Sequence, residues 1–224
     1  MNIALFGGTF DPIHSGHLQA ARAAARRFRL NRILFVPTGS PPHKVRDGLT
    51  DFPHRFAMVA LACGEDRRFV PSLLESPTAD GRARYSVDTV RAVRRLLGRR
   101  DRLFFLIGVD AFLDLPDWKE YRRLLELVNF IVVSRPGFNF ARIRSVVPPD
   151  LLRPPRGREP RDTIRLRHTT IQVLQGVDVP VASRDIRQAI RAARPVTGLV
   201  PRLVEQYILK EGLYRSRLGG THPD

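Results

Sequence analysis

The chain has 224 residues, of which 43% are hydrophobic, so it is long enough to bury one sizeable core and favours one large domain over two. Its single cysteine excludes an intramolecular disulfide framework, and no apolar run approaches the ~20 residues that a membrane-spanning helix needs. Met1 leads directly into an apolar run without the basic segment and long apolar core of a signal peptide, so we expect a cytoplasmic protein without membrane contact.

The net charge of +16 is the strongest compositional signal, because a basic surface attracts nucleic acids and other polyphosphates. Nearly all of this charge is arginine, and much of it is spread over helix faces that we expect to be solvated, such as the face with Arg91, Arg94 and Arg95. No aromatic-interleaved basic motif of the RNA-recognition type accompanies the charge. Nucleic-acid binding is therefore not the expected primary role.

The first elements of the chain form an arrangement typical of phosphate binding. The apolar run Ile3–Phe6 predicts a strand buried on both faces, Gly7 and Gly8 predict a turn that a ligand can approach, and Leu18–Phe28 has helical apolar spacing. The first amides of a helix have no intrahelical partner and carry the positive end of the helix dipole. The sequence therefore predicts an anion site at the start of this helix.

Two histidines, His14 and His17, stand beside this predicted anion site. With only two residues between them, both rings can face the same side of the helix entrance and contact a phosphate. For an isolated pair with this spacing, one histidine capping the helix and the other packing is the more ordinary interpretation. A metal site would need a third ligand, such as Cys63 or a distant carboxylate, so we expect no resident metal; Cys63 itself, between small and apolar neighbours, is expected to be buried.

Apolar runs with strand character alternate with segments of helical spacing along the chain. The strands are expected at Ile3–Phe6, Ile33–Pro37, Phe69–Pro71, Leu103–Ile107, Phe130–Ser134 and Ile171–Leu174. The helices are expected at Leu18–Phe28, Pro53–Ala62, Val87–Arg99, Ala111–Leu115, Tyr121–Leu127, Arg184–Ala193 and Pro201–Glu211. This alternation predicts an α/β fold, a doubly wound, Rossmann-like and mostly parallel sheet with helices on both faces. Because ligands bind outside the carboxyl ends of such strands, we expect Gly7–Gly8, Pro37–Lys44, Gly108–Asp110 and Arg135 to converge on one cleft.

The segment near 148–167 is rich in proline and arginine, and turn and extended residues dominate it. We interpret it as a surface insertion between strands, with a phosphate-contacting lid as the alternative. The residues 216–224 are expected to form a frayed tail. The sequence thus predicts a single domain over residues 1–215.

The segment Gly7–His17 resembles the GxFDPxHxGH signature of the nucleotidylyltransferase superfamily. Further matches, in the order found in bacterial nicotinate-nucleotide adenylyltransferases, are Pro41–Lys44, Tyr85–Thr89, Gly108–Asp110 followed by Trp118, Arg135–Gly137, Val181–Arg187 and Val200–Tyr214. The resemblance covers nearly the whole chain. Ala182 and Arg184 depart from the usual serine and threonine of that family, Val109 from its alanine, and Ser40 from its aromatic residue.

The resemblance implies transfer of AMP from ATP to nicotinate mononucleotide, with nicotinate adenine dinucleotide and pyrophosphate as products, in NAD biosynthesis. The alternatives within this reaction are nicotinamide mononucleotide, or less readily pantetheine phosphate, as the acceptor. A non-catalytic RNA-associated protein with the same fold is the alternative of another class. A homo-oligomer is compatible with the sequence, which carries no direct sign of the oligomeric state.

The resemblance also implies roles for individual residues. The residues expected to bind ATP are Gly7, Gly8, Thr9, Phe10, His14, His17, Lys44, Gly108, Asp110, Arg135, Ser183, Ile186 and Arg187. Of these, His14, His17, Lys44 and Arg187 are expected to be catalytic, and Tyr85, Ser86 and Trp118 are expected to shape the mononucleotide site. Without the resemblance, Asp110 is as readily a helix cap and Trp118 a half-buried core aromatic. Mg²⁺ is expected to arrive with the ATP phosphates, because the sequence shows no dedicated acidic cluster.

Overall fold

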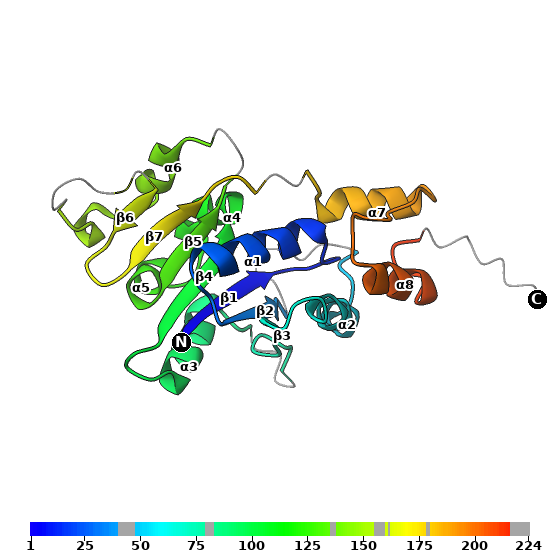
Figure 1. The fold of residues 1–224 in the computed structure, drawn as a ribbon, viewed down its shortest axis with the longest axis horizontal. Helices are drawn as coiled ribbons and strands as arrows, with labels where there is room; N and C mark the ends of the chain where they lie inside the picture. Colours follow the sequence, from blue (N-terminus) through cyan, green and yellow to red (C-terminus); the bar gives the residue numbers. More distant parts are fainter. Residues whose placement is uncertain are drawn as a thin grey trace, which may run out of the picture.

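The computed structural model describes residues 1–39, 48–78, 83–134, 138–154, 160, 162–177 and 180–215. Its strands are β1 (Asn2–Gly8), β2 (Arg32–Pro37), β3 (Phe69–Pro71), β4 (Arg102–Gly108), β5 (Asn129–Val133), β6 (Thr163–Arg165) and β7 (Thr170–Leu174) (Figure 1). Its α-helices are α1 (Ser15–Arg27), α2 (Phe52–Cys63), α3 (Ser86–Leu96), α4 (Val109–Leu113), α5 (Tyr121–Leu127), α6 (Phe140–Ser145), α7 (Ser183–Arg191) and α8 (Arg202–Lys210). Two short 3₁₀ helices, η1 (Leu115–Asp117) and η2 (Pro149–Leu151), follow α4 and α6.

The strands form a seven-stranded sheet in the order β3-β2-β1-β4-β5-β7-β6. Every neighbouring pair is parallel except β6 and β7, which are antiparallel. The predicted doubly wound, Rossmann-like fold is therefore confirmed. The order reverses between β1 and β4, which is the point where open sheets of this kind bind ligands.

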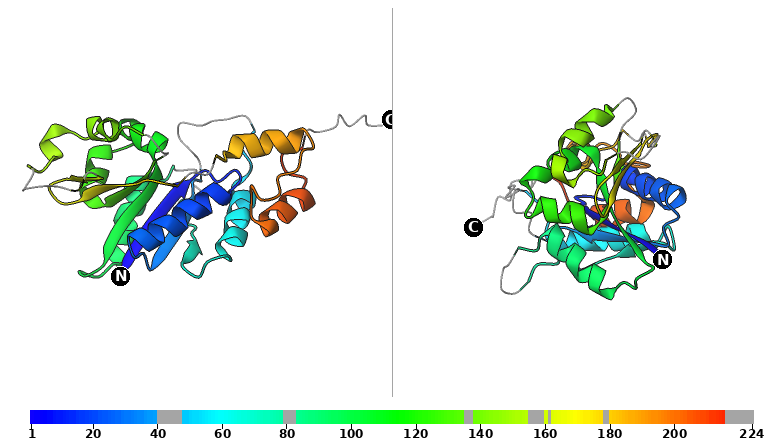
Figure 2. Two further views of the ribbon diagram at one scale, coloured as in Figure 1. Left: turned by 45° about the horizontal axis from the view of Figure 1, so that its top comes forward. Right: turned by 90° about the vertical axis from the view of Figure 1, so that its left-hand side faces the viewer.

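Alternate side chains of each strand pack on opposite faces of the sheet, so the molecule has two hydrophobic cores. One face, with Ala4 and Phe6 of β1, packs against α1, α2, α7 and α8. The other face, with Ile3 and Leu5 of β1, packs against α3, α4, α5 and α6. Figure 2 shows α7 and α8 together at one end of the molecule, beside the start of α1, with β6 and β7 at the opposite end.

Three features differ from the sequence-based expectations. Gly7 and Gly8 do not form a turn, because β1 continues through them and pairs with Val36 and Pro37 of β2. The turn comes later, at Phe10, whose backbone lies in the left-handed region at φ 50°. The short helix α6 and the edge strand β6 were not predicted, and β6 lies within the segment interpreted as a surface insertion.

The expected burial of Cys63 is confirmed, since its side chain is buried at the end of α2. Burial raises the pKa of the thiol to about 12, so it is protonated and unreactive at neutral pH. No helix in the described part of the chain is long and apolar enough to cross a membrane.

Replacing Phe35 by alanine tests how strongly the sheet depends on this aromatic core. The ring is fully buried in β2 and lies against the rings of Phe6, Phe10 and Phe69, so truncation leaves a cavity. We expect the free energy of unfolding to fall by about 3–5 kcal/mol in urea denaturation. Leu96→Ala, at an 82% exposed side chain, is the control and should change it by less than about 0.5 kcal/mol. Equal effects of the two substitutions would contradict this packing.

Candidate active site

A cleft of about 830 Å³ opens at the carboxyl ends of β1 and β4, where the strand order reverses. Its lining residues are Gly7, Gly8, Thr9, Thr38, Glu75, Arg84, Tyr85, Ser86, Phe105, Ile107, Gly108, Ala111, Asp114, Asp117, Trp118 and Lys119. The volume is that of a site for a small molecule or a nucleotide. The cleft brings together seven of the predicted site residues, which come from four separate segments of the chain: Gly7, Gly8, Thr9, Tyr85, Ser86, Gly108 and Trp118.

Glycines at the strand ends keep the floor of the cleft open. A Cβ atom on Gly8 would lie 3.1 Å from the ring of Phe10, so a side chain there would press on the residue that begins the turn. A Cβ atom on Gly108 would meet no atom within 4 Å, so a side chain there would project into the space that the cleft provides. The two glycines therefore serve different purposes, one for packing and one for ligand approach.

One wall of the cleft is built from α3 and the segment before α5. Trp118 is half-buried and lies edge-to-face against Phe105, with 6.1 Å between ring centroids. The ammonium group of Lys119 lies 4.1 Å from the ring centroid of Tyr85. An ion pair of 2.6 Å between Arg91 and Glu120 ties α3 to the same segment. This wall therefore offers an aromatic face beside a positive charge.

The rings of His14 and His17 lie against each other, with centroids 3.7 Å apart and planes tilted by 30°. The N–H of His14 donates to Nδ1 of His17 over 3.2 Å, so the remaining ring proton of a neutral His17 is assigned to Nε2. Nδ1 of His14 is buried and has no hydrogen-bond partner in the described part of the chain. The predicted juxtaposition of the two rings is present, and the edge of Phe10 supports His17 at 5.0 Å.

Both imidazoles are neutral at pH 7 in the absence of a ligand. Burial lowers the pKa of His14 to about 4. Burial, together with the nearby His14, holds the pKa of His17 well below its ordinary value. An anion bound beside the rings would act in the opposite direction and favour the protonated form.

The start of α1 has fewer free amides than the sequence suggested. The amide of Ser15 donates to the carbonyl of Leu199 at 2.9 Å, and the amide of His14 is used by His17. The amide of Gly16 has no acceptor among the described residues, so it is the one available at this helix entrance. The start of α1 therefore offers fewer backbone amides to an anion than the sequence predicted.

Helix α7 begins beside the same loop and brings two further predicted residues to it. The hydroxyl of Ser183 donates to the carbonyl of Pro12 at 2.9 Å, and the guanidinium of Arg187 donates to the carbonyl of Asp11 at 2.6 Å. The amides of Ser183 and Arg184 have no acceptor within the part of the chain that the structure describes. Two helix starts, α1 and α7, thus meet at the loop between β1 and α1.

Other predicted residues lie elsewhere. The side chains of Phe10 and Ile186 are buried in the core, so only their backbone groups could contact a nucleotide. Asp110 is exposed in the first turn of α4 and does not line the cleft. Lys44 and Arg135 lie outside the described residues.

Sequence reasoning missed Arg55, which is only 1% exposed. Its guanidinium donates to the carbonyls of Thr50, Thr9, Thr38 and Gly39 over 2.8–3.2 Å, and so joins the loops that follow β1 and β2. Burial lowers the pKa of Arg55, while Asp11 has the largest effect among the charges that favour its cationic form. The helical period was the available signal, because it places Arg55 on the same face as the buried Met58, Val59 and Ala62.

The contact between Asp11 and Tyr214 was also missed. Asp11 is 4% exposed, and its carboxylate accepts hydrogen bonds from the Tyr214 hydroxyl at 2.6 Å and from the Thr50 amide at 3.3 Å. Burial and the Asp11 carboxylate raise the pKa of Tyr214, so it remains a hydrogen-bond donor. No local pattern near Tyr214 could have revealed a partner 203 residues away.

The described residues include no group of three or more histidine, cysteine, aspartate or glutamate side chains that could hold a metal ion. His14, His17, Ser183 and Arg187 do not line the cleft; they lie along the loop between β1 and α1, which begins at the cleft residue Thr9. Donors of these kinds are suited to phosphate oxygens. Chemically, the arrangement can hold an anion at the helix starts and an aromatic ring against the Trp118 wall.

Comparison with known proteins places this geometry in context. The model of the cytidylyltransferase-like family matches residues 5–189. The chain is 39% identical over 203 residues to a probable nicotinate-nucleotide adenylyltransferase of Solibacter usitatus, covering 90% of this chain and 93% of that protein. It is 37% identical over 220 residues to the probable enzyme of the same name from Moorella thermoacetica, covering 98% and 94%.

Solved structures with the same fold include nicotinic acid mononucleotide adenylyltransferase of Plasmodium falciparum. Its complex with NaAD aligns with a TM-score of 0.71 and 18% identity, over 95% of this chain and 97% of that one. Its complex with APC aligns with a TM-score of 0.68, also at 18% identity, over 95% and 96%. At this identity the likeness concerns the fold.

Removing the hydroxyl of Tyr214 tests the contact that holds the loop between β1 and α1. In Tyr214→Phe, the buried Asp11 carboxylate loses its shortest hydrogen bond, so we expect the free energy of unfolding to fall by about 1–3 kcal/mol. Urea denaturation measures the change. Tyr207→Phe is the matched control, since that hydroxyl contacts the half-buried His54, and its effect should be below about 1 kcal/mol. A Tyr214→Phe variant as stable as the wild type would show that the hydrogen bond to Asp11 does not stabilise this loop.

Proposed function

Because the chain belongs to the nicotinate-nucleotide adenylyltransferases of the cytidylyltransferase-like family, we propose that it transfers AMP from ATP to nicotinate mononucleotide. The products are nicotinate adenine dinucleotide and pyrophosphate, in NAD biosynthesis. The observation that carries the proposal is the cleft at the strand-order reversal, which has a glycine floor and the Trp118 wall and includes Thr9, at the start of the loop that leads to the paired imidazoles. A neighbour of this fold was solved with NaAD, the dinucleotide product of this reaction.

In the proposed reaction, an oxygen of the mononucleotide phosphate attacks the α-phosphorus of ATP. The new bond joins this oxygen to the α-phosphorus, and the bond from the α-phosphorus to the bridging oxygen breaks, so pyrophosphate leaves with the electron pair. Both reactants are anions, so the site must supply fixed positive potential and alignment. A protein nucleophile is not required, because the acceptor phosphate is itself the nucleophile.

We assign the charge-stabilising role at the α-phosphate to His17. Its Nδ1 is occupied by the His14 amide, so its Nε2–H is the group that can donate to a phosphate oxygen. His14, stacked on this ring, carries an unpartnered Nδ1 that a second phosphate contact would satisfy. Because phosphates favour protonated imidazole, ATP binding would raise the pKa of both rings from their lowered values.

Ser183 and Arg187 are proposed to hold the β- and γ-phosphates until they leave. Both groups donate to carbonyls of the loop between β1 and α1. For a ligand there remain the amide of Ser183, which has no acceptor among the described residues, and further guanidinium protons of Arg187. By family resemblance, Lys44 and Arg135 would add positive charge, and Gly108 and Asp110 would hold the adenosine. Mg²⁺ would be held mainly by ATP phosphate oxygens and water.

The acceptor is proposed to bind against the Trp118 wall. Trp118 offers a face on which a pyridine ring can stack, and the side chain of Ser86 lines the same end of the cleft as a hydrogen-bond donor. The ammonium group of Lys119 over Tyr85 gives this end a positive charge, which suits an anionic ring substituent. An activity that uses ATP, in a chain whose one cysteine is buried, fits the cytoplasm as the proposed location.

An acceptor assay tests the reaction class and the substrate together. Purified protein, ATP and Mg²⁺ are supplied with nicotinate mononucleotide, nicotinamide mononucleotide or pantetheine phosphate, and pyrophosphate release is followed. We expect the highest kcat/KM with nicotinate mononucleotide and loss of activity when a chelator removes Mg²⁺. Turnover only with nicotinamide mononucleotide would overturn the acceptor, and no turnover with any acceptor would favour a binding protein on this fold.

His17→Ala tests the assignment of the transition-state donor. Loss of one preorganised donor at the reacting phosphate should lower kcat by at least about a hundredfold, with the folded state retained in circular dichroism. His168→Ala, at an exposed residue next to β7 and outside the cleft, is the matched control and should leave kcat within about twofold of wild type. Near-normal turnover of His17→Ala would remove this residue from the mechanism.

A further inference from the structure

Glu75 is a buried carboxyl group in the wall of the cleft. It lies in the segment between β3 and α3, is 6% exposed and lines the cleft together with Tyr85 and Ser86. Its backbone is fixed against the end of β2, where a Cβ atom on Gly39 would overlap with the Glu75 carbonyl oxygen. Glu75 therefore lines the same cleft as Tyr85, Ser86 and Trp118, the residues proposed to bind the acceptor.

A single hydroxyl connects Glu75 to the predicted mononucleotide site. Oγ1 of Thr89 lies 2.9 Å from Oε1 of Glu75 and 3.4 Å from the carbonyl oxygen of Tyr85. Thr89 is also buried, in the first turn of α3, which starts at Ser86. The Thr89 hydroxyl therefore lies within hydrogen-bond distance of both the Glu75 carboxyl group and the turn that carries Tyr85 and Ser86.

Burial raises the pKa of Glu75 to about 7, and the hydrogen bond from Thr89 only partly opposes this effect. The carboxyl group is therefore mainly protonated below neutral pH and mainly ionised above it. Few acidic side chains change charge in this range, and such groups are characteristic of functional sites.

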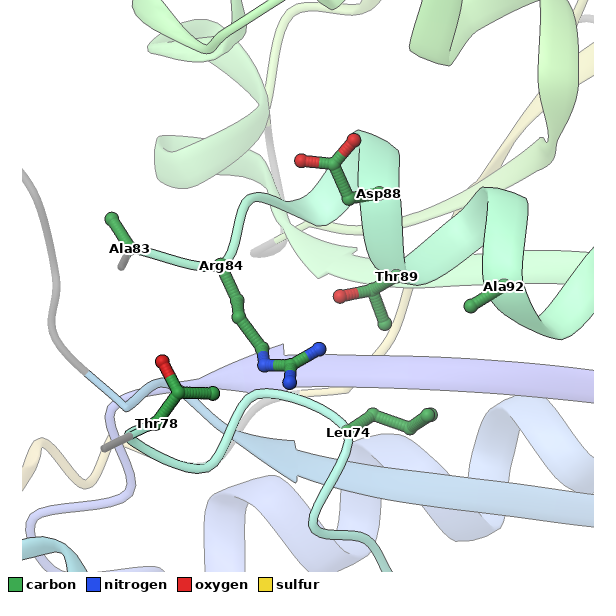
Figure 3. A pocket seen from close by; sticks show the side chains of 7 residues that line it. All are labelled: Leu74, Thr78, Ala83, Arg84, Asp88, Thr89 and Ala92. Carbon is green, nitrogen blue, oxygen red and sulfur yellow. The ribbon is translucent and has the colours of Figure 1, made fainter. Parts of the chain in front are cut away.

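A second, smaller cavity of about 330 Å³ includes Thr89 in its lining (Figure 3). It is lined by Leu74, Thr78, Ala83, Arg84, Asp88, Thr89 and Ala92. Figure 3 shows Arg84 extending from the segment before α3 toward the segment with Leu74 and Thr78, and this residue lines both cavities. The Glu75–Thr89 pair and Arg84 therefore stand between the two spaces.

Several charged residues line the cleft or the smaller cavity, or lie behind the wall that carries Glu75. Arg84 and Asp88 come from its own side of the cleft, while Lys119, Asp114 and Asp117 come from the other wall. The buried Arg55 lies behind Gly39. Arg84, Asp114, Asp117 and Lys119 line the cleft. Arg84 and Lys119 are exposed, so solvent screens the charges of these two side chains more strongly than the charge of the buried Glu75 carboxylate.

The two pyridine mononucleotides differ in the charge of one ring substituent, which is a carboxylate in the nicotinate form and a neutral amide in the nicotinamide form. A protonated Glu75 exerts no net repulsion on either and can donate a hydrogen bond to a carboxylate. An ionised Glu75 repels the carboxylate and leaves the amide largely unaffected. Glu75 is therefore placed to make acceptor preference depend on its own proton.

We propose that Glu75, held by Thr89 at the wall of the cleft, is a specificity-determining residue whose protonated form admits the acidic pyridine acceptor and whose ionised form disfavours it relative to the amide. The proposal rests on the proposed function, since it concerns the acceptor of that reaction. It adds a positioning role for Thr89, which holds the carboxyl group in place and links it to the start of α3.

Fluorescence of Trp118 provides a test that does not depend on turnover. Trp118 is the single tryptophan of the chain and lines the cleft, so mononucleotide binding should quench it. The Kd of each mononucleotide is measured at a series of pH values from about 6 to about 8.5, and the ratio of the two constants is compared across the series. The ribose phosphate titrates near pH 6 in both ligands, so its effect cancels in the ratio.

In the wild type, the preference for nicotinate over nicotinamide mononucleotide should fall by at least about threefold as the pH rises, because a full negative charge develops beside the acidic ligand. In Glu75→Gln, which keeps the shape and the acceptor for Thr89, the ratio should stay constant over the same range. Glu65→Gln, at an exposed residue outside the cleft that pairs with Arg22, should show the wild-type dependence. Thr89→Val removes a hydrogen bond that lowers the pKa of Glu75, so the fall should move to higher pH.

A constant ratio in the wild type would overturn the proposal without any reference to the variants. An unchanged fall in a folded Glu75→Gln variant would also overturn it, by assigning the effect to another group. Failure of both mononucleotides to quench Trp118 would instead count against the proposed acceptor site and thus against the proposed function. The two failures are therefore distinguishable.

Discussion

The guanidinium of Arg55 supplies the contact on which the geometry of the cleft depends. It donates to carbonyls of Thr9, Thr38, Gly39 and Thr50, so one planar group joins the loops that follow β1 and β2. A buried cation that lost these acceptors would be left without compensation in a poorly polar interior. Separating these loops would therefore cost free energy, because Arg55 would lose its hydrogen bonds. This keeps the floor of the cleft in place before any nucleotide binds.

The loop between β1 and α1 is held from several other directions. Tyr214 and the Thr50 amide bind the Asp11 carboxylate, Arg187 binds the Asp11 carbonyl, and Ser183 binds the Pro12 carbonyl. For a transfer between two anions, this matters because dipoles and donors that are already oriented need no reorganisation during the reaction. Burial also matters for Glu75. Because its carboxyl group is shielded from solvent, a neighbouring negative charge favours its protonated form.

Much of the fold could be predicted because buried parallel strands leave a strong local pattern. Six of the seven strands were expected at their observed positions, including the short β3. The strand β6 has three residues and lies among prolines and arginines, so its pairing with β7 had no local signature. Gly7 and Gly8 were expected to form a turn that a ligand can approach, but pairing with β2 extends the strand through them.

The sequence by itself determined the parallel strands, the α-helices other than α6 and the chemistry of the signature segment with His14 and His17, because periodicity and motif spacing are local properties of a chain. The tertiary structure decided which donors remain free and which groups change their pKa. Ser15 loses its amide to Leu199, Asp11 gains Tyr214, and Glu75 becomes buried against Thr89. These outcomes depend on burial and on partners far away in the sequence, and both exist only once the chain has folded.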